Sequence, residues 1–401
     1  MKFAKIFDLN KEKLSKNVFA GFLVVFFVYT LAATLESSHL WGVVPHQDII
    51  NVRNIRQIVW FFSILLIAFN KYSVKNLKIG MFLFIFLLQN FSSTGFNNNF
   101  TTNHFTVIIV CFAMANRKIE LPIKTLLFGT IVGFVAVILA YLFGIIEHVY
   151  EFRLDSVDEI RVRNPLGFNL AVISQGLYLN IALAFIYLNR YKLTLLKLIS
   201  ILIPGAVIYY LTGSRNSFAL LVMAVICSLI FKSRKNEKAS SLFYYGSLVA
   251  FFGLFLFSVI TTIMFDYDAE GMQLLDHFTS QRLAFQSSYW DQYSLTLFGQ
   301  RLHRVGTVRA RITGEPRMIL DNAFLNLILE SGLILTSIIT IALTKLLKKL
   351  KENQDVISLI IWLIAIVSLL LASATMYFWR NPLLFQFSFL LINNNRLKEG
   401  R

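Results

Sequence analysis

The apolar stretch "MILDNAFLNLILESGLI" (residues 318–334) carries two carboxylates, Asp321 near its start and Glu330 inside it. A charged group within a membrane segment is costly and is usually paired or functional. Asp321 lies where the stretch begins, so it can act as a general base or as an N-cap that binds backbone N–H groups. Glu330 follows nine residues later, about 13.5 Å along a helix and roughly on its opposite face. We therefore predict a chemical role for Asp321 and, for Glu330, a buried polar partner such as an Asn, Gln or Tyr.

A second candidate is an arginine in the short turn "LTGSRNSF" (residues 211–218). Gly213 permits a turn conformation, and Ser214 or Asn216 can cap the helix that follows. Arg215 would then stand at a helix N-terminus, where the backbone dipole and a guanidinium group together attract an anion. The alternative is a loop arginine that extends its side chain to lipid headgroups.

A third candidate is the aromatic segment "SQRLAFQSSYWDQYSLTLFG" (residues 280–299). On helical spacing, Arg282, Phe285, Tyr289 and Tyr293 fall on one face, which predicts an amphipathic helix that "FGQR" (298–301) ends. Such a helix could lie on a membrane surface. Its aromatic side chains could stack on sugars, although burial against other helices is the more frequent use of such a stripe.

The elements that must position these residues are membrane helices. The chain has 401 residues, of which 56% are hydrophobic and 15% charged, and its mean hydropathy is +0.64. About a quarter of the residues in a soluble domain are charged, so this composition indicates an all-α polytopic membrane protein with about twelve transmembrane helices. The apolar runs lie near residues 18–34, 54–70, 79–93, 100–116, 125–146, 167–188, 195–212, 216–231, 243–265, 319–343, 356–374 and 381–393. The last run is short, which indicates a tilted or re-entrant segment.

The basic residues predict the orientation of these helices. Every lysine falls at one set of helix ends, whereas the basic residues at the other ends are all arginines. The positive-inside rule places the lysine side and both termini in the cytoplasm. No small-residue cleavage site follows the lysine-rich N-terminus, so we expect a retained first helix. The arginine-only face suggests an outer surface that handles an anion, although arginine also tolerates headgroups well.

The prediction is therefore one integral membrane domain, residues 1–401, in the cytoplasmic membrane. Its large extracytoplasmic loop, residues 267–318, joins the ninth and tenth helices and is rich enough in aromatic residues to fold. Cys111 and Cys227 lie in apolar runs, and neither a disulfide framework nor metal-ligand spacing is evident. The net charge of +16 is mainly a signal of topology, and we expect membrane lipids rather than nucleic acid as partners.

The order of four motifs resembles the bacterial O-antigen polymerase and ligase family, which includes the Wzy-type polymerases of O-antigen and capsule synthesis. The motifs are "RVRNPLGFN" (161–169), "TGSRNSF" (212–218), "QRLAFQSSYWDQYSLTLFG" (281–299) and "DNAFLNLILESGLI" (321–334). The resemblance covers roughly residues 160–335 by motif and the remainder by topology alone. It departs from the family in two places: ligases usually have His where this chain has Asp321, and "FGQR" replaces the usual G-x-G.

The resemblance implies a GT-C-like fold and an oligosaccharide repeat unit on undecaprenyl pyrophosphate as the substrate, presented at the outer leaflet. It implies a catalytic role for Asp321 as the base, and for Arg215 and Arg282 as groups that stabilise the departing pyrophosphate. His277 and His303 are alternative bases, although loop histidines are more often surface residues. The expected substrate-binding residues are Arg163, Asn164, Arg301, Asn322 and Tyr289. No metal and no cofactor are expected, whereas a chain-length regulator and a flippase of the same pathway are possible partners.

Other functions remain open from the sequence. A ligase would use the same chemistry on a different acceptor, but the Asp321 departure favours a polymerase. A non-enzymatic transporter of the same lipid usually shows inverted repeats and charges within its helices, and no convincing repeat is present. The motifs of the membrane peptidoglycan glycosyltransferases are also not found.

Overall fold

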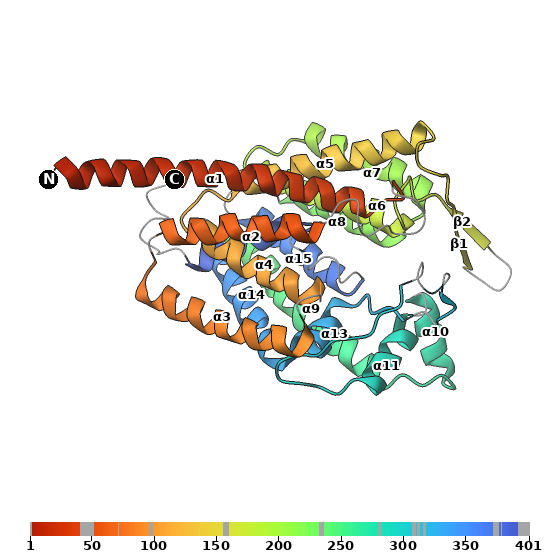
Figure 1. Ribbon diagram of the computed structural model, residues 1–401. Coiled ribbons are helices and arrows are strands. Elements are labelled where there is room, and N and C mark those ends of the chain that lie inside the picture. Colours follow the sequence, from red (N-terminus) through yellow and green to blue (C-terminus); the bar gives the residue numbers. More distant parts are fainter. Residues whose placement is uncertain are drawn as a thin grey trace. The chain divides into compact units, whose positions relative to one another are not determined.

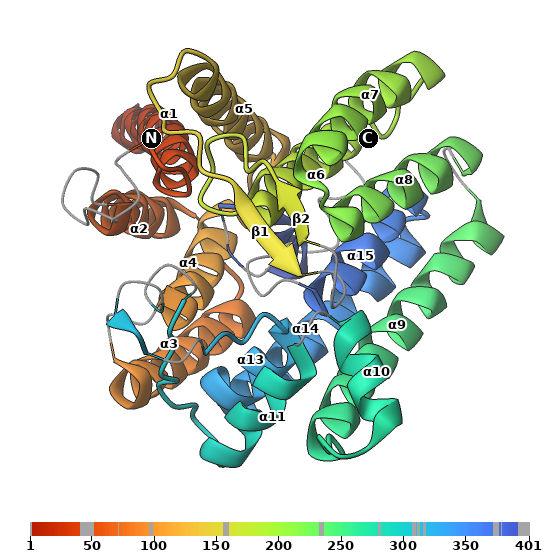
Figure 2. The ribbon, with the colours of Figure 1, turned by 90° about the vertical axis from the view of Figure 1, so that its right-hand side faces the viewer.

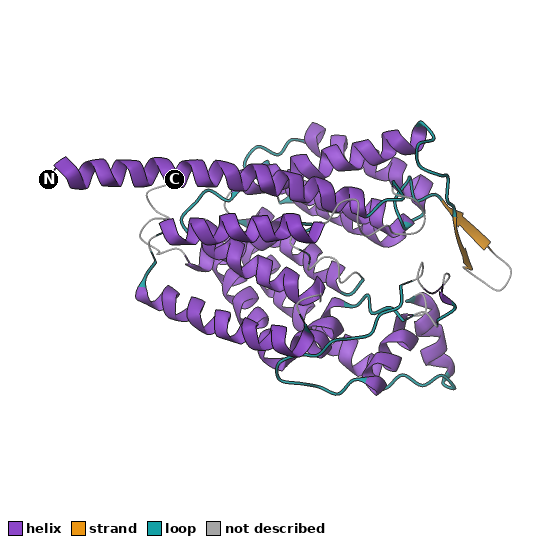
Figure 3. Cartoon of the chain, in the orientation of Figure 1, coloured by secondary structure: helices purple, strands orange, loops and turns teal. Residues whose placement is uncertain are grey.

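The computed structural model describes residues 2–40, 52–70, 72–95, 99–154, 160–231, 236–279, 282–306, 310, 313–315, 318–371, 377 and 379–391. Regular structure in this part of the chain is helical, apart from one two-stranded hairpin and two isolated bridges (Figures 1 and 3). Among the described residues, eight helices are long and apolar enough to cross a membrane. The predicted all-α, multi-pass class is confirmed at this level.

The chain forms two compact units, each assembled from segments that are distant in sequence. The first unit comprises Met1–Asn76, Thr106–Lys232 and Trp379–Arg401, and the second comprises Leu77–Phe105 and Ser233–Phe378. Helix α4 (Asn99–Met114) runs from the second unit into the first.

The first unit is built around α1 and α5. Its elements are α1 (Lys2–Glu36), α2 (Val52–Phe69), α5 (Glu120–Leu142), β1 (Glu151–Leu154), β2 (Ile160–Arg163), α6 (Ala171–Leu188), α7 (Leu195–Thr212), α8 (Arg215–Ile230) and η3 (Pro382–Leu391). Gly129 and Gly133 of α5 lie one turn apart against Thr30 and Thr34 of α1, where an added Cβ would collide. Small residues at this spacing let two membrane helices approach closely.

The hairpin of the first unit leads into α6. Strands β1 and β2 pair antiparallel, with Glu151 opposite Arg163. The Glu151 carboxylate accepts a hydrogen bond of 3.1 Å from the backbone N–H of Ala171, the first residue of α6. Leu170 at the N-cap position has no side-chain acceptor, so this glutamate replaces the missing cap. The span predicted at 167–188 therefore begins four residues later, after a tight turn.

The last apolar run forms η3, a ten-residue 3₁₀ helix. At about 2 Å per residue it is roughly 20 Å long, shorter than a hydrocarbon core of about 30 Å. The expected shortness is confirmed. Three further apolar helices fall below the length of a full span: Thr101–Met114, Arg215–Ile230 and Val356–Leu369. The count of twelve crossings thus stays a prediction.

The second unit is organised by α9 (Glu237–Ile263), which packs against α11, α13, α14 and α15 (Figures 1 and 2). Its other elements are α3 (Val74–Thr94), most of which lies in this unit, α10 (Glu270–Phe278), α11 (Arg282–Gln292), α13 (Ala323–Asn326), η1 (Leu327–Ser331), α14 (Gly332–Glu352) and α15 (Val356–Leu369). Residues 267–318, the predicted outer loop, contain α10 and α11. The aromatic helix predicted to reach Phe298 ends at Gln292, so that prediction was too long.

Candidate active site

The candidate site begins at an irregular helix in the second unit. The stretch that follows Asp321 forms one turn of α-helix, the five-residue π-helix η1, and then α14. Gly332 takes a φ of 80° at the join, and the Thr336 hydroxyl bonds the carbonyls of both Leu327 and Gly332 at 2.8 Å. π-helical turns inside longer helices frequently occur at functional sites. Sequence periodicity predicted a regular helix here and did not reveal this irregularity.

A backbone contact explains the glycine at the join. The segment around Gly299 runs against the π-helix, with Gln300 N–H bonding Glu330 O at 3.2 Å and Leu333 N–H bonding Thr296 O at 3.0 Å. A Cβ on Gly299 or on Gly332 would overlap the backbone of the other segment. "FGQR" thus departs from the family motif in sequence but still supplies a glycine that permits a close backbone approach.

Arg282 and Asp321 form an ion pair. The Arg282 Nε and the Asp321 Oδ2 lie 3.6 Å apart, and the side chains are 22% and 40% exposed, respectively. The pair is therefore accessible to a ligand while it is partly shielded from water. Of the sequence-predicted catalytic residues, these two are brought together within one unit.

The start of α11 fixes Arg282. Asp276 of α10 is buried, and its Oδ1 accepts hydrogen bonds from Leu283 N–H at 2.9 Å and Ala284 N–H at 3.1 Å. A carboxylate on the first N–H groups caps α11 and stabilises the helix from which Arg282 projects. Sequence analysis missed Asp276; the available signal was an acidic residue shortly before the amphipathic segment.

The N-cap beside the site is Asn322, not Asp321. The Asn322 Oδ1 accepts from Phe324 N–H at 3.0 Å, and its Nδ2 donates to the Ser258 hydroxyl at 2.9 Å. Asn322 is fully buried. The prediction that it binds substrate does not fit this position, because both ends of its amide are used within the protein. The capping role considered for Asp321 is also wrong, and its carboxylate is left for Arg282.

A second ion pair joins Arg304 to Glu330. The Arg304 Nη2 contacts the Glu330 Oε2 and also donates to the Asn326 Oδ1 at 2.5 Å. The Glu330 side chain is only 4% exposed. An arginine from the loop, rather than an Asn, Gln or Tyr of a neighbouring helix, therefore balances this glutamate. Sequence reasoning missed Arg304 because it sits 26 residues before Glu330 and follows no helical spacing.

Tyr289 connects the surroundings of both pairs. It is fully buried in a cluster with Leu302, Leu320 and other apolar residues, so the predicted sugar-stacking surface at Tyr289 does not exist. Its hydroxyl donates to the His303 carbonyl at 2.8 Å. Burial raises the pKa of Tyr289 to about 12, and the Arg304 guanidinium opposes that shift. The negative charges of Glu330 and Asp321 push the pKa in the same direction as burial.

The remaining loop candidates lie at the surface. Arg301 and the His303 side chain are exposed, and His277 is exposed at the end of α10. Arg309, Arg311 and Arg317 lie outside the described residues.

The other predicted residues belong to the first unit. Gly213 takes a φ of 61° and ends α7 as expected, which leaves Arg215 exposed as the first residue of α8. Ser214 occupies the N-cap position, but its side chain makes no capping bond, so the predicted cap is wrong. Arg163 is buried at the end of β2.

Asn164 uses its amide inside the first unit. Its Nδ2 donates to the Tyr141 hydroxyl at 2.6 Å, and its Oδ1 accepts from Leu166 N–H at 2.9 Å. These bonds hold the tight turn before α6. The geometry therefore gives Asn164 a structural position in place of the expected contact with substrate.

Within the described residues, no three His, Cys, Asp or Glu side chains gather closely enough to hold a metal ion. Cys111 is buried and Cys227 half-buried, and both are free thiols. Comparison of the chain with protein-family models, with curated proteins and with solved structures found no match.

Proposed function

We propose that the chain is a membrane glycosyltransferase that joins oligosaccharide repeat units carried on undecaprenyl pyrophosphate into a surface polysaccharide. The proposal includes twelve membrane crossings, a GT-C-like fold, cytoplasmic termini and a site on the outer face of the cytoplasmic membrane. It is supported by the multi-pass helical architecture and by the motif order from "RVRNPLGFN" to "DNAFLNLILESGLI".

The observation that carries the proposal is the Arg282–Asp321 pair. A buried, closely bonded pair would serve packing, but these two side chains are 3.6 Å apart and both reach solvent. A guanidinium and a carboxylate that are this accessible can separate, and each can then bind a different part of one substrate. The Asp276 carboxylate caps α11 and so fixes the helix that carries Arg282. It does this through backbone N–H groups, so the cap does not involve the Arg282 or the Asp321 side chain.

In the proposed reaction, Asp321 accepts the proton of the acceptor sugar hydroxyl as that oxygen attacks the anomeric carbon of the donor. The bond between this carbon and the pyrophosphate oxygen breaks, and negative charge develops on the pyrophosphate. Arg282 is positioned to stabilise that charge more strongly in the transition state than in the ground state. No cofactor takes part. Arg215 and Arg163 are proposed, from the sequence motifs alone, as residues that bind phosphate.

The experiment supplies the purified full-length chain with an undecaprenyl-pyrophosphate-linked oligosaccharide. A ladder of products is expected from a polymerase, whereas a ligase would give a single addition to a different acceptor. Arg215→Ala and Arg282→Ala should each abolish the ladder at unchanged protein level. Arg53→Ala is the matched control, since Arg53 is an exposed arginine of α2 to which no part in the site is assigned. Normal ladders from Arg282→Ala would overturn the role of the pair, and absence of any glycosyl transfer would overturn the proposal.

A further inference from the structure

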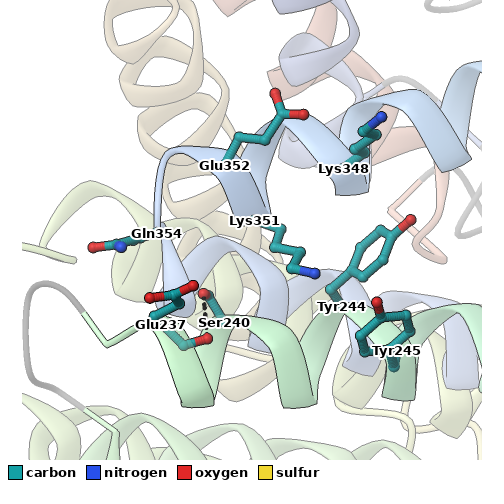
Figure 4. A pocket seen from close by; sticks show the side chains of 8 residues that line it. All are labelled: Glu237, Ser240, Tyr244, Tyr245, Lys348, Lys351, Glu352 and Gln354. Atoms are coloured by element: carbon teal, nitrogen blue, oxygen red, sulfur yellow. Dashed lines mark hydrogen bonds between the residues drawn. The ribbon is translucent and has the colours of Figure 1, made fainter.

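A pocket of about 380 Å³ lies between the start of α9 and the end of α14, within the second unit (Figure 4). Helix α14 has 21 residues from Gly332 to Glu352, so about 30 Å of helix separates this pocket from the π-helix beside the candidate active site. Both helices belong to apparent membrane spans. The pocket therefore lies where two spans leave the hydrocarbon and reach the headgroup region.

The pocket presents charges of both signs. Lys348 and Lys351 line it from α14, and Glu237 lines it from α9, with Glu352 at the end of α14. Within the described part of the chain, these lysines and glutamates form no ion pair with one another. Separate cations and anions in one cavity of this size suit a ligand that itself carries both charges.

Lys351 is held toward the middle of the pocket. Its Nζ lies 5.1 Å from the ring centre of Tyr244 and 4.7 Å from that of Tyr245. Figure 4 shows its side chain extending from α14 toward both rings, while Glu237 lies at the start of α9, before the two tyrosines. Cation–π contacts orient an ammonium group but do not occupy its N–H donors. An oxyanion bound in the pocket can accept hydrogen bonds from these donors.

The backbone at the edge of the pocket is strained. Gln354 follows α14 with a φ of 52°, a conformation that glycine adopts far more easily. Its N–H bonds the Lys351 carbonyl at 2.9 Å and closes the helix end. Glutamine thus lines the pocket at a position where glycine is the more usual residue.

An exposed apolar stripe continues from the pocket along α9. Tyr245, Val249, Phe252 and Leu256 are spaced four, three and four residues apart and are all exposed. This spacing places them on one face of the helix. From Tyr245 to Leu256 the stripe is about 16 Å long, close to half of a hydrocarbon core of about 30 Å. The acyl chains of a lipid can cover this stripe, whereas a free headgroup has no apolar part to place on it.

We propose that this pocket binds a zwitterionic phospholipid with a primary ammonium group. Its phosphate accepts hydrogen bonds from Lys351 and Lys348, its ammonium donates to Glu237, and its acyl chains lie along the stripe of α9. The inference is independent of the reaction proposed above, because the pocket shares no residue with the candidate active site.

The test measures lipid retained by the full-length protein in nanodiscs or mild detergent, using native mass spectrometry. Phosphatidylethanolamine is compared with phosphatidylglycerol, which lacks the ammonium, and with phosphatidylcholine, whose ammonium cannot donate hydrogen bonds. Retention of phosphatidylethanolamine should exceed both by roughly tenfold, as expected when one charge-assisted hydrogen bond is lost. Equal or stronger retention of phosphatidylglycerol would overturn the proposal, and so would displacement of the lipid by free phosphoethanolamine at low concentration.

Variants locate the site. Lys351→Met and Glu237→Gln should each reduce retention about tenfold. Lys345→Met is the matched control, since Lys345 is an exposed lysine of α14 that does not line the pocket. Unchanged retention in Lys351→Met and Glu237→Gln, with both proteins folded, would refute the site.

Discussion

Two arginine–carboxylate pairs in the second unit differ in what surrounds them. Arg282 and Asp321 are 3.6 Å apart, and the carboxylate is 40% exposed, whereas the Glu330 side chain that pairs with Arg304 is 4% exposed. A buried pair resists separation because either charge left alone loses both its partner and its water. A half-exposed pair exchanges its partner for a ligand at little cost. The same residue types thus form a pair that a ligand can reach in one place and a buried structural pair in the other.

The largest expected effect is on activity. Asp321→Asn keeps the size of the side chain but removes the base, so the rate of glycosyl transfer should fall by roughly 10²–10⁴-fold. The melting temperature should stay within the error of the wild-type protein, because the residue is half-exposed and does not cap α13. The rate is measured with the purified protein and the lipid-linked oligosaccharide.

His303→Ala is the control for this experiment. The His303 side chain is exposed, and only its backbone is bonded to Tyr289 and Tyr293. Its rate should remain within about twofold of wild type, since no general base is removed. A normal rate in Asp321→Asn together with a large loss in His303→Ala would show that His303, and not Asp321, is the general base.

The next effect is on stability. Arg304→Met removes the guanidinium that pairs with the buried Glu330 carboxylate beside Asn326, which should destabilise the protein by roughly 3 kcal/mol. The combined variant Arg304→Met, Glu330→Gln should recover much of that loss, since no buried charge then remains. Melting in detergent measures both. A stable but inactive Arg304→Met protein would contradict the comparison, because it would make Arg304 a substrate contact.

The smallest effect concerns pH. Because the pKa of Tyr289 is raised from 10.0 to about 12, folding favours the neutral phenol. The resulting stabilisation is fully present below pH 10 and is lost as the pH rises from 10 to about 12. Melting temperatures measured across this range should fall less steeply in Tyr289→Phe than in wild type. Parallel curves would show that burial does not raise the pKa of Tyr289 in the folded protein.

The sequence predicted the multi-pass helical class and named the residues of one of the two ion pairs in the second unit. Apolar length and the lysine pattern indicate membrane helices because both follow from local composition, and "DNAFLN" and "SQRLAF" indicated Asp321 and Arg282 from residue type. The partner of Glu330 could not be predicted, because Arg304 reaches it through a loop with no regular spacing. The roles of Asn322 and Tyr289 were misjudged for a related reason. Polar and aromatic side chains near a site look alike in sequence whether they face a ligand or hold the backbone.

The backbone contact between Gly299 and Gly332 also bears on how this protein can change. This contact joins the two ends of the segment from Gly299 to Gly332. Within that segment, a bridge between Val305 and Met318, with hydrogen bonds of 2.9 and 3.0 Å, joins the ends of a shorter loop. Lengthening a loop whose ends are already joined costs only about 0.6 kcal/mol per doubling. An insertion between Val305 and Met318 should therefore cost little stability and leave the backbone contact between Gly299 and Gly332 intact.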